Sequence, residues 1–245
     1  LSNDGRFVVF RSRATNLVAD DTNGWSDIFV HDRASAETTR VSVASDGTQA
    51  DGGSYFPVIA GNGRYVAFQS RASNLTTGQT GAPIGVFVHD RETGVTADVA
   101  IRNDGTVSEV SAYLPALDGA GRFVVFQSAD DTLVDGDTNG VADIFLRDRV
   151  TNTTSRVSVA SDGTGLAKGG QLPAISDDGR FVAFRSRPPA TETEGTNDVV
   201  LRDLQSGETS TIWVGPDNTQ AALTGDQPAI SADGRYVAFL APFTP

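Results

Sequence analysis

Cysteine and methionine are both absent from this chain, and only one of its basic residues, Lys168, is a lysine. Without cysteine there is no disulfide, no thiolate metal site and no catalytic thiol, but the cellular compartment stays open. No apolar run approaches the roughly 20 residues that a membrane helix needs, so we expect no membrane insertion. No charged-then-apolar signal segment opens the chain, and Leu1 is not an initiator. We therefore expect a single domain, 1–245, processed or excised from a longer protein.

Positive charge is also scarce. The chain has 19 lysines and arginines against 31 aspartates and glutamates, which gives a formal net charge of −12. A surface this acidic repels phosphate backbones, so we expect no nucleic-acid partner. A sustained apolar period of about 3.6 residues is missing as well, which argues against amphipathic helices.

One short segment recurs along the whole chain. Its clearest copy is Asp178-Gly179-Arg180-Phe181-Val182-Ala183-Phe184. The glycine of the segment stands at positions 5, 63, 121, 179 and 234, so the copies are 58, 58, 58 and 55 residues apart. A fixed period of this size indicates a repeat architecture.

Each complete repeat holds four short apolar segments separated by Gly, Asp, Asn, Ser and Thr; in the third repeat they are 113–117, 122–127, 143–146 and 155–159. Such segments predict β-strands. The second segment is apolar at nearly every position, as expected when sheets cover both of its faces. We therefore predict an all-β fold, a β-propeller of four-stranded antiparallel blades, rather than a β-sandwich or a β-solenoid. The first repeat lacks its innermost strand and the last stops after its second strand, which predicts seventeen strands in four repeats plus part of a fifth. We expect this chain to be part of a larger propeller rather than a ring that closes unusually.

The segments 173–184 and 228–239 resemble the TolB-like, or PD40 (WD40-like), propeller repeat, and the resemblance extends over essentially the whole chain. The family often has Pro-Asp-Gly at the turn, where this chain has Asp177-Asp178-Gly179, Asn62-Gly63 or Ala120-Gly121. Glycine supplies the turn geometry in either case. The resemblance implies a propeller fold and frequent export from the cytoplasm, but no single activity.

A polar loop of the first repeat, Asp21-Thr22-Asn23-Gly24-Trp25-Ser26-Asp27, recurs 116 residues later as Asp137-Thr138-Asn139-Gly140-Val141-Ala142-Asp143. Side-chain oxygens at positions 1, 3 and 7, with the carbonyl at position 5, suit a hard cation such as Ca²⁺. The alternative is an Asx-rich turn that caps its own backbone. The equivalent loops at 80–85 and 194–198 lack or shorten the motif, so the fold does not require these charges. We therefore predict structural Ca²⁺ sites. The first would be formed by Asp21, Asn23, Trp25 and Asp27, the second by Asp137, Asn139, Val141 and Asp143.

Catalytic residues are hard to find in this sequence. The two histidines, His31 and His89, lie 58 residues apart and are replaced by Arg147 and Arg202 in later repeats, which predicts a solvated position. No Gly-x-Ser-x-Gly elbow is present, and nothing distinguishes one carboxylate pair from another. We therefore lean towards a protein that is not an enzyme.

In a propeller the innermost strands line the central channel, so a ligand is expected at the mouth of that channel. The prolines of these strands, at 57, 115, 173 and 228, do not change between repeats, whereas their neighbours do. The predicted ligand contacts are Ser54, Tyr55, Tyr113, Gln171 and Asp226. Trp25 is a further candidate contact, although packing against a blade edge is the simpler interpretation.

These observations favour a non-catalytic binding or scaffolding propeller of an exported bacterial protein, located in the periplasm, outside the cell or on its surface. Its ligand is expected to be a protein, a peptide or a glycan. The alternative is a hydrolase-associated propeller, which either gates a peptidase domain or hydrolyses a glycan or peptide at the channel mouth. All five copies of the recurring segment keep Gly-Arg, and this sameness predicts a structural arginine, so function is expected where the repeats differ.

Overall fold

The computed structural model describes residues 1–77, 83–186, 198–212 and 226–240, and all regular structure within them is β-strand. The described residues form seventeen strands in five sheets, as the repeat pattern predicts. The first sheet comprises β1 (Phe7–Ser12), β2 (Asp27–Asp32) and β3 (Glu37–Arg40). The second comprises β4 (Ser54–Ile59), β5 (Tyr65–Ser70), β6 (Gly85–Asp90) and β7 (Thr96–Asp98). The third comprises β8 (Ala112–Leu117), β9 (Phe123–Ser128), β10 (Asp143–Asp148) and β11 (Thr153–Arg156). The fourth comprises β12 (Gln171–Ile175), β13 (Phe181–Ser186), β14 (Asp198–Asp203) and β15 (Thr209–Thr211), and the fifth β16 (Asp226–Ile230) and β17 (Val237–Leu240).

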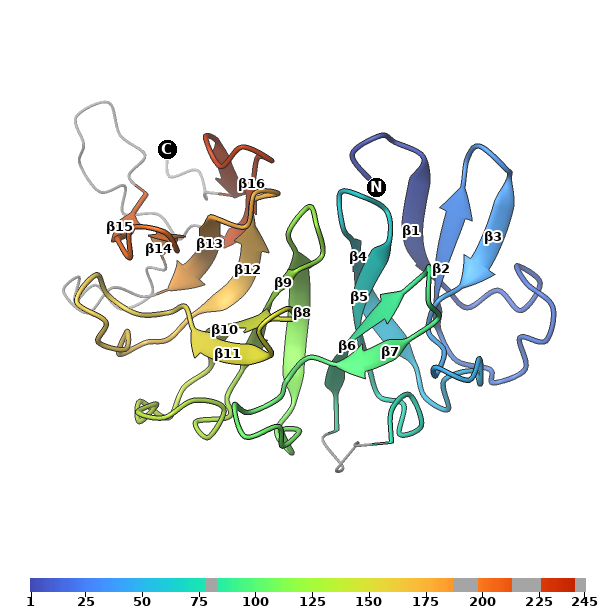
Figure 1. Ribbon diagram of the computed structural model, residues 1–245, viewed down its shortest axis with the longest axis horizontal. Coiled ribbons are helices and arrows are strands. Elements are labelled where there is room, and N and C mark those ends of the chain that lie inside the picture. Colours follow the sequence, from blue (N-terminus) through green and yellow to red (C-terminus); the bar gives the residue numbers. More distant parts are fainter. Residues whose placement is uncertain (78–82, 187–197, 213–225, 241–245) are drawn as a thin grey trace, which may run out of the picture.

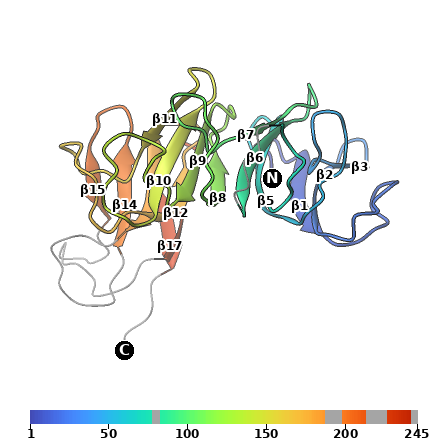
Figure 2. The same ribbon diagram turned by 90° about the horizontal axis from the view of Figure 1, so that it is seen from below.

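Each sheet is a blade whose strands pair antiparallel in chain order, from the inner strand outwards. The blades follow one another around an arc, from the N-terminal sheet through the green and yellow sheets to β16 (Figure 1). Seen from below, β17 lies at the end of this series, and its partner β16 packs beside the fourth blade (Figure 2). The all-β propeller prediction, with four repeats and part of a fifth, is confirmed.

The second and third strands of the complete blades form the core. Phe68, Phe126 and Phe184 on the second strands are fully buried, because a neighbouring blade covers each face of their sheet. The Phe126 ring stacks on Phe145 of the third strand at a centroid distance of 5.8 Å, and the first two blades repeat this pair. Each buried phenylalanine contributes about 1.5–3 kcal/mol through removal of its apolar surface from water. These apolar second strands therefore hold the blades together.

The recurring Asp-Gly-Arg segment makes the joint between blades. Its glycine has a positive φ, +71° at Gly179, and a Cβ there would lie 2.6 Å from the Phe123 ring of the preceding blade. The joints pair Phe7 with Gly63, Tyr65 with Gly121, Phe123 with Gly179, and Phe181 with Gly234. Glycine is needed at this position both for its backbone conformation and for the close approach of the ring.

The arginine of the same segment closes a bidentate ion pair within its own blade. In the second blade Arg64 donates from Nε and Nη2 to the two carboxylate oxygens of Asp90, at 2.8 and 2.6 Å. The four pairs are Arg6 with Asp32, Arg64 with Asp90, Arg122 with Asp148, and Arg180 with Asp203. The arginine hydrogen bonds hold the pKa of each aspartate well below its usual range. The arginine is a structural residue, as its sameness in all repeats predicts.

Candidate functional site

The inner strands of the last four blades carry a bulge at the same place. The pairing register with the second strand shifts between Tyr55 and Val58 in β4, and the other three inner strands shift at the equivalent step. Within each bulge a residue other than glycine adopts the left-handed conformation. These residues are Phe56 with φ 49°, Leu114 with φ 51°, Leu172 with φ 54°, and Gln227 with φ 48°.

A proline follows each left-handed residue, at positions 57, 115, 173 and 228. Proline has no N–H to give to a sheet ladder, so a bulge is one of the few places where a paired strand accepts it. A left-handed residue other than glycine costs about 1–3 kcal/mol, and such strain persists where the surrounding structure imposes it, often at functional sites. The same strained step therefore occurs four times on the strands that line the channel.

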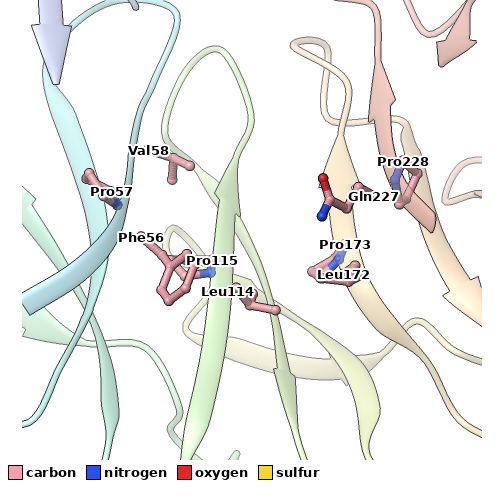
Figure 3. A pocket seen from close by; sticks show the side chains of 9 residues that line it. All are labelled: Phe56, Pro57, Val58, Leu114, Pro115, Leu172, Pro173, Gln227 and Pro228. Carbon is pink, nitrogen blue, oxygen red and sulfur yellow. The ribbon is translucent and has the colours of Figure 1, made fainter. Parts of the chain in front are cut away.

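The bulges line one pocket of about 260 Å³. Figure 3 shows its side chains on four successive inner strands, with the left-handed residues beside their prolines. The lining residues are Phe56, Pro57, Val58, Leu114, Pro115, Leu172, Pro173, Gln227 and Pro228. The wall is apolar except for Gln227, and Phe56 is 55% exposed. This pocket is a candidate ligand site, because it gathers side chains from four successive inner strands.

The predicted mouth residues lie one step before this pocket. Ser54 is fully buried and donates to Oγ of Ser70 at 3.0 Å. Tyr55 packs under the Arg11 guanidinium, 5.3 Å from its ring centroid, and Gln171 accepts a hydrogen bond from Arg185. Tyr113 is partly buried and pairs with Gln127, and Asp226 pairs with Leu240.

None of the five predicted residues lines this pocket. The residues that directly follow Tyr55, Tyr113, Gln171 and Asp226 in the sequence line it instead. The sequence carried a usable signal for this. The residue before the unchanging proline is Phe, Leu and Leu in three copies and Gln in the fourth, so the position is apolar in three of four repeats. In a regular strand, the residue before the proline would point to the face opposite that of its predecessor. The bulge interrupts this alternation and lets the residue before the proline line the pocket.

The two Asp-Thr-Asn-Gly loops form closed hydrogen-bonded clusters. Asn23 Nδ2 donates to Oδ2 of Asp27 at 3.0 Å and to the Ala50 carbonyl at 2.9 Å, while its Oδ1 accepts from the Trp25 N–H at 2.9 Å. The other Asp27 oxygen accepts from Ser42 Oγ at 2.6 Å. Asp27 is completely buried, and this burial raises the pKa of its carboxyl.

The second copy of the loop has the same bonds. Asn139 Nδ2 donates to Asp143 at 2.8 Å, and its Oδ1 accepts from the Val141 N–H at 3.1 Å. Burial likewise raises the pKa of Asp143. In both copies the asparagine Oδ1 accepts a backbone N–H two residues further on, which is the Asx-turn arrangement.

An arginine supplies the positive charge of each cluster. Arg156 Nη1 lies 2.6 Å from Asp137 Oδ1 and 3.8 Å from Asp143 Oδ2. In the first copy Arg40 Nη1 lies 3.3 Å from Asp21. The two arginines are 116 residues apart, as the loops are, and the repeat without an aspartate loop has Asp98 at the equivalent position. The aspartate and the arginine thus occur together, which indicates that they are counterions.

These residues, as arranged, do not fit a Ca²⁺ ion, which takes six to eight oxygen ligands. One carboxylate oxygen in each loop, of Asp21 and Asp137, is buried without a hydrogen-bond donor, but an arginine stands beside each carboxylate. Of the described residues, no three acidic, histidine or cysteine side chains form a metal-binding group. Trp25 is 48% exposed. The calcium sites stay a prediction.

The histidine position is not solvated as predicted. His89 is 6% exposed and its Nδ1 lies 2.9 Å from Oγ1 of Thr96 on the fourth strand. Arg147 occupies the equivalent place, is equally buried and donates to Thr154. The prediction was wrong for His89 and Arg147, because the blade faces cover the third strand there; His31 and Arg202 at the same position are partly exposed. Each histidine lies within hydrogen-bond distance of a threonine on the outer strand, Thr38 for His31 and Thr96 for His89. Desolvation lowers the pKa of His89.

Comparisons with solved structures agree with this architecture. TolB from Acinetobacter baumannii matches at 15% identity and a TM-score of 0.55 over 96% of this chain and 46% of that one. A protein assigned as TolB from Agrobacterium tumefaciens matches at 18% identity and a TM-score of 0.59 over 99% of this chain and 73% of that one. This chain has a TolB-like propeller fold.

The propeller domain of the Trilobed protease from Pyrococcus furiosus, described as having an open velcro topology, is 11% identical, with a TM-score of 0.59 over 100% of this chain and 64% of that one. No family model and no curated protein matches the sequence. The chain spans about half the length of the Acinetobacter TolB, and identities this low establish the TolB-like fold alone. Among the described residues, no helix is long and apolar enough to cross a membrane.

Proposed function

We propose that this TolB-like propeller is a non-catalytic binding module whose ligand lies in the pocket formed by the four inner-strand bulges. The observation that carries this proposal is the fourfold repetition of a strained, left-handed residue on the pocket wall. A fold that needed only a turn there would be served by glycine, which adopts this conformation without strain. Instead each copy presents a side chain to the pocket.

The chemistry of the wall favours an apolar segment of a protein or peptide over a glycan. Eight of the nine lining residues are apolar and none is charged. Glycan binding requires hydrogen-bonding groups for many hydroxyls, and Gln227 alone offers such a side chain here. A pocket of about 260 Å³ is slightly smaller than a typical small-molecule site, and fits one or two apolar side chains.

The setting of this module is proposed to be the periplasm, the cell surface or the outside of a bacterial cell. Its support is the likeness to two bacterial TolB structures. The second candidate function is a gating propeller of a peptidase, supported by the likeness to the propeller domain of the Trilobed protease. Under that alternative, the catalytic residues belong to a domain outside these 245 residues.

A peptide-display selection on the 245-residue chain tests the proposal. Leu114→Asn and Leu172→Asn keep residues that tolerate the left-handed conformation but make the wall polar. Val150→Asn is the matched control, because Val150 is 71% exposed and lies away from the pocket. We expect apolar peptides that bind the wild type and the control but lose at least tenfold in affinity for the pocket variants. Binders that ignore both pocket substitutions, or cleavage of the peptides by this chain, would contradict it.

A further inference from the structure

A second cavity, here called the first groove, lies between the first and second blades. It holds about 430 Å³, and its walls come from the turn that follows β3, the loop that follows β5 and the start of β7. Four of its lining residues are serine or threonine, and one, Asp46, is charged. The lining residues are Ala44, Ser45, Asp46, Asn74, Leu75, Thr76, Thr77 and Thr96. A cavity of this size is large enough for a small-molecule ligand.

The equivalent second groove, between the second and third blades, contains an arginine side chain of the protein itself. Arg102 stands 58 residues after Ala44, at the same position of the turn. Its Nε donates to Oγ1 of Thr132 at 2.8 Å and its Nη2 to Oδ2 of Asp130 at 3.2 Å, both on the loop of the third blade. A guanidinium group therefore bridges the two walls of the second groove.

The first groove lacks this arginine. The two turns are held by the same bond, because the Ala44 N–H donates to the Thr48 carbonyl and the Arg102 N–H to the Thr106 carbonyl, each at 2.8 Å. Ala44 therefore lines its groove at the place where Arg102 enters the other one, but its side chain ends at Cβ. The cavity occupies the space that the arginine crosses in the second groove.

The turn of each groove also carries an aspartate. The N–H of Thr48 lies 2.9 Å from Oδ1 of Asp46, and the bonds from Thr48 lower the pKa of Asp46 and keep it ionised. Bonds from Thr106 and, to a smaller extent, the charge of Arg102 lower the pKa of the equivalent Asp104. Among the residues that the structure describes, no arginine, lysine or histidine forms an ion pair with Asp46. The first groove thus has the acidic turn without the cation.

We propose that the first groove binds a small organic cation with a guanidinium group on an apolar stem, as in an arginine side chain. The cation takes the place that Arg102 takes in the second groove. Its stem lies against Ala44 and Leu75, and its N–H groups donate to the Asp46 carboxylate and to hydroxyl groups of the wall. This site is separate from the pocket of the inner-strand bulges and does not depend on the function proposed above.

Nα-acetylarginine amide is the probe, and calorimetry at low salt measures its binding to the 245-residue chain. We expect a Kd of about 1 mM, because Ala72 stands where Asp130 supplies a carboxylate in the second groove. Nα-acetylcitrulline amide has nearly the same shape without the charge, and should bind about fivefold more weakly or worse. Butylguanidinium separates two sources of the group. Equal affinity would indicate a free guanidinium compound, and weaker affinity an arginine residue of a peptide.

Three variants locate the site. Ala44→Arg copies the second groove and should abolish binding, because its side chain occupies the cavity. Asp46→Asn keeps the turn but loses the charge, and should weaken binding about fivefold. Asp104→Asn is the matched control, because Asp104 accepts the same turn bond, from the Thr106 N–H at 2.8 Å, beside a groove that Arg102 already fills. This control should bind the probe as the wild type does.

The second groove offers a complementary measurement. Arg102→Ala opens it, and butylguanidinium at about 10 mM should raise the Tm of this variant by more than that of the wild type. Equal Tm shifts, equal binding of the arginine and citrulline amides, or no binding up to about 10 mM would overturn the proposal. Binding retained by a folded Ala44→Arg variant, or equal losses in Asp46→Asn and Asp104→Asn, would overturn it as well.

Discussion

Removal of Arg156 is the sharpest test of how the aspartate loops are held. The side chain of Arg156 is 10% exposed, and those of Asp137 and Asp143 are 2% and 0% exposed. The substitution Arg156→Gln leaves two buried carboxyl groups without a countercharge, and breaking a buried pair in this way costs about 3–5 kcal/mol. At roughly 2–4 °C per kcal/mol for a chain of this size, the lower bound corresponds to a fall in Tm of roughly 6–12 °C.

Thermal and urea unfolding, followed by circular dichroism, measure this loss. Arg180→Gln is the control, because that arginine is 43% exposed in its pair with Asp203 and a surface pair contributes about 1 kcal/mol or less. An Arg156→Gln variant that is no less stable than Arg180→Gln would refute the counterion interpretation.

Calcium enters the same experiment as a second variable. If the arginine takes the place of a cation, Ca²⁺ at about 1 mM leaves the Tm of the wild type unchanged and raises that of Arg156→Gln, where the carboxylates of Asp137 and Asp143 have lost their countercharge. Stabilisation of the wild type by Ca²⁺, reversed by a chelator, would instead establish the calcium sites that the loop sequences predict.

The pH dependence of this variant has a definite sign. Burial raises the pKa of Asp143, so the folded protein holds a proton on this group more tightly than the unfolded chain does. The resulting stability is present at low pH and is lost as the pH rises through the folded pKa. Loss of Arg156 raises that pKa further, so the destabilisation by Arg156→Gln should be smaller at about pH 5 than at about pH 8.

Three further predictions concern the fold. Gly179→Ala should cost about 2–4 kcal/mol in urea unfolding, because it strains the backbone and pushes against Phe123, whereas Gly163→Ala, with nothing within 4 Å of its Cβ, should cost about 1 kcal/mol; equal losses would contradict the joint. Because burial lowers the pKa of His89, this residue contributes stability above its unfolded pKa, near 6.5, and the contribution is lost as the pH falls through the folded pKa. The substitution His89→Arg copies Arg147 and removes the titrating group. The free energy of unfolding should then fall less steeply as the pH drops below about 6.5. If 1–245 is a single domain, circular dichroism and fluorescence should report one coincident unfolding transition, and separated transitions would refute it.

The fold was predictable from the sequence because its signals are local and repeated. Apolar segments of strand length, turn glycines and a period of 58 residues gave the blades, and the missing strands at both ends were visible as missing segments. Packing of Gly179 against Phe123 joins residues one repeat apart. The period places them in the recurring segments of adjacent blades, but it does not show that they touch.

The candidate site was harder to predict from the sequence than the fold, for two physical reasons. A bulge reverses the alternation of a strand, so counting from Tyr55 along a regular strand leads away from Phe56, the residue that lines the pocket. In the aspartate loops, the spacing of the motif shows which side chains carry oxygen atoms, but it does not show which cationic side chains pair with them. Arg156 lies nineteen positions beyond Asp137, so the loop sequence alone does not contain its countercharge. Comparison of the repeats does contain it, because Asp98 replaces the arginine where the loop lacks its aspartates.

The left-handed residues of the pocket wall allow stability and binding to be separated. Leu114 is partly buried and its N–H donates to Oε1 of Gln69 at 3.3 Å, a bond that glycine would keep. Leu114→Gly removes a backbone strain of about 1–2 kcal/mol and adds a comparable cost in chain entropy and lost contact. The free energy of unfolding should therefore change by no more than about 1 kcal/mol, whereas binding of peptides selected on the wild type should be lost. A loss of stability above about 2 kcal/mol would show that Leu114 holds the inner strands together, and the strain would then have a structural cause rather than a ligand.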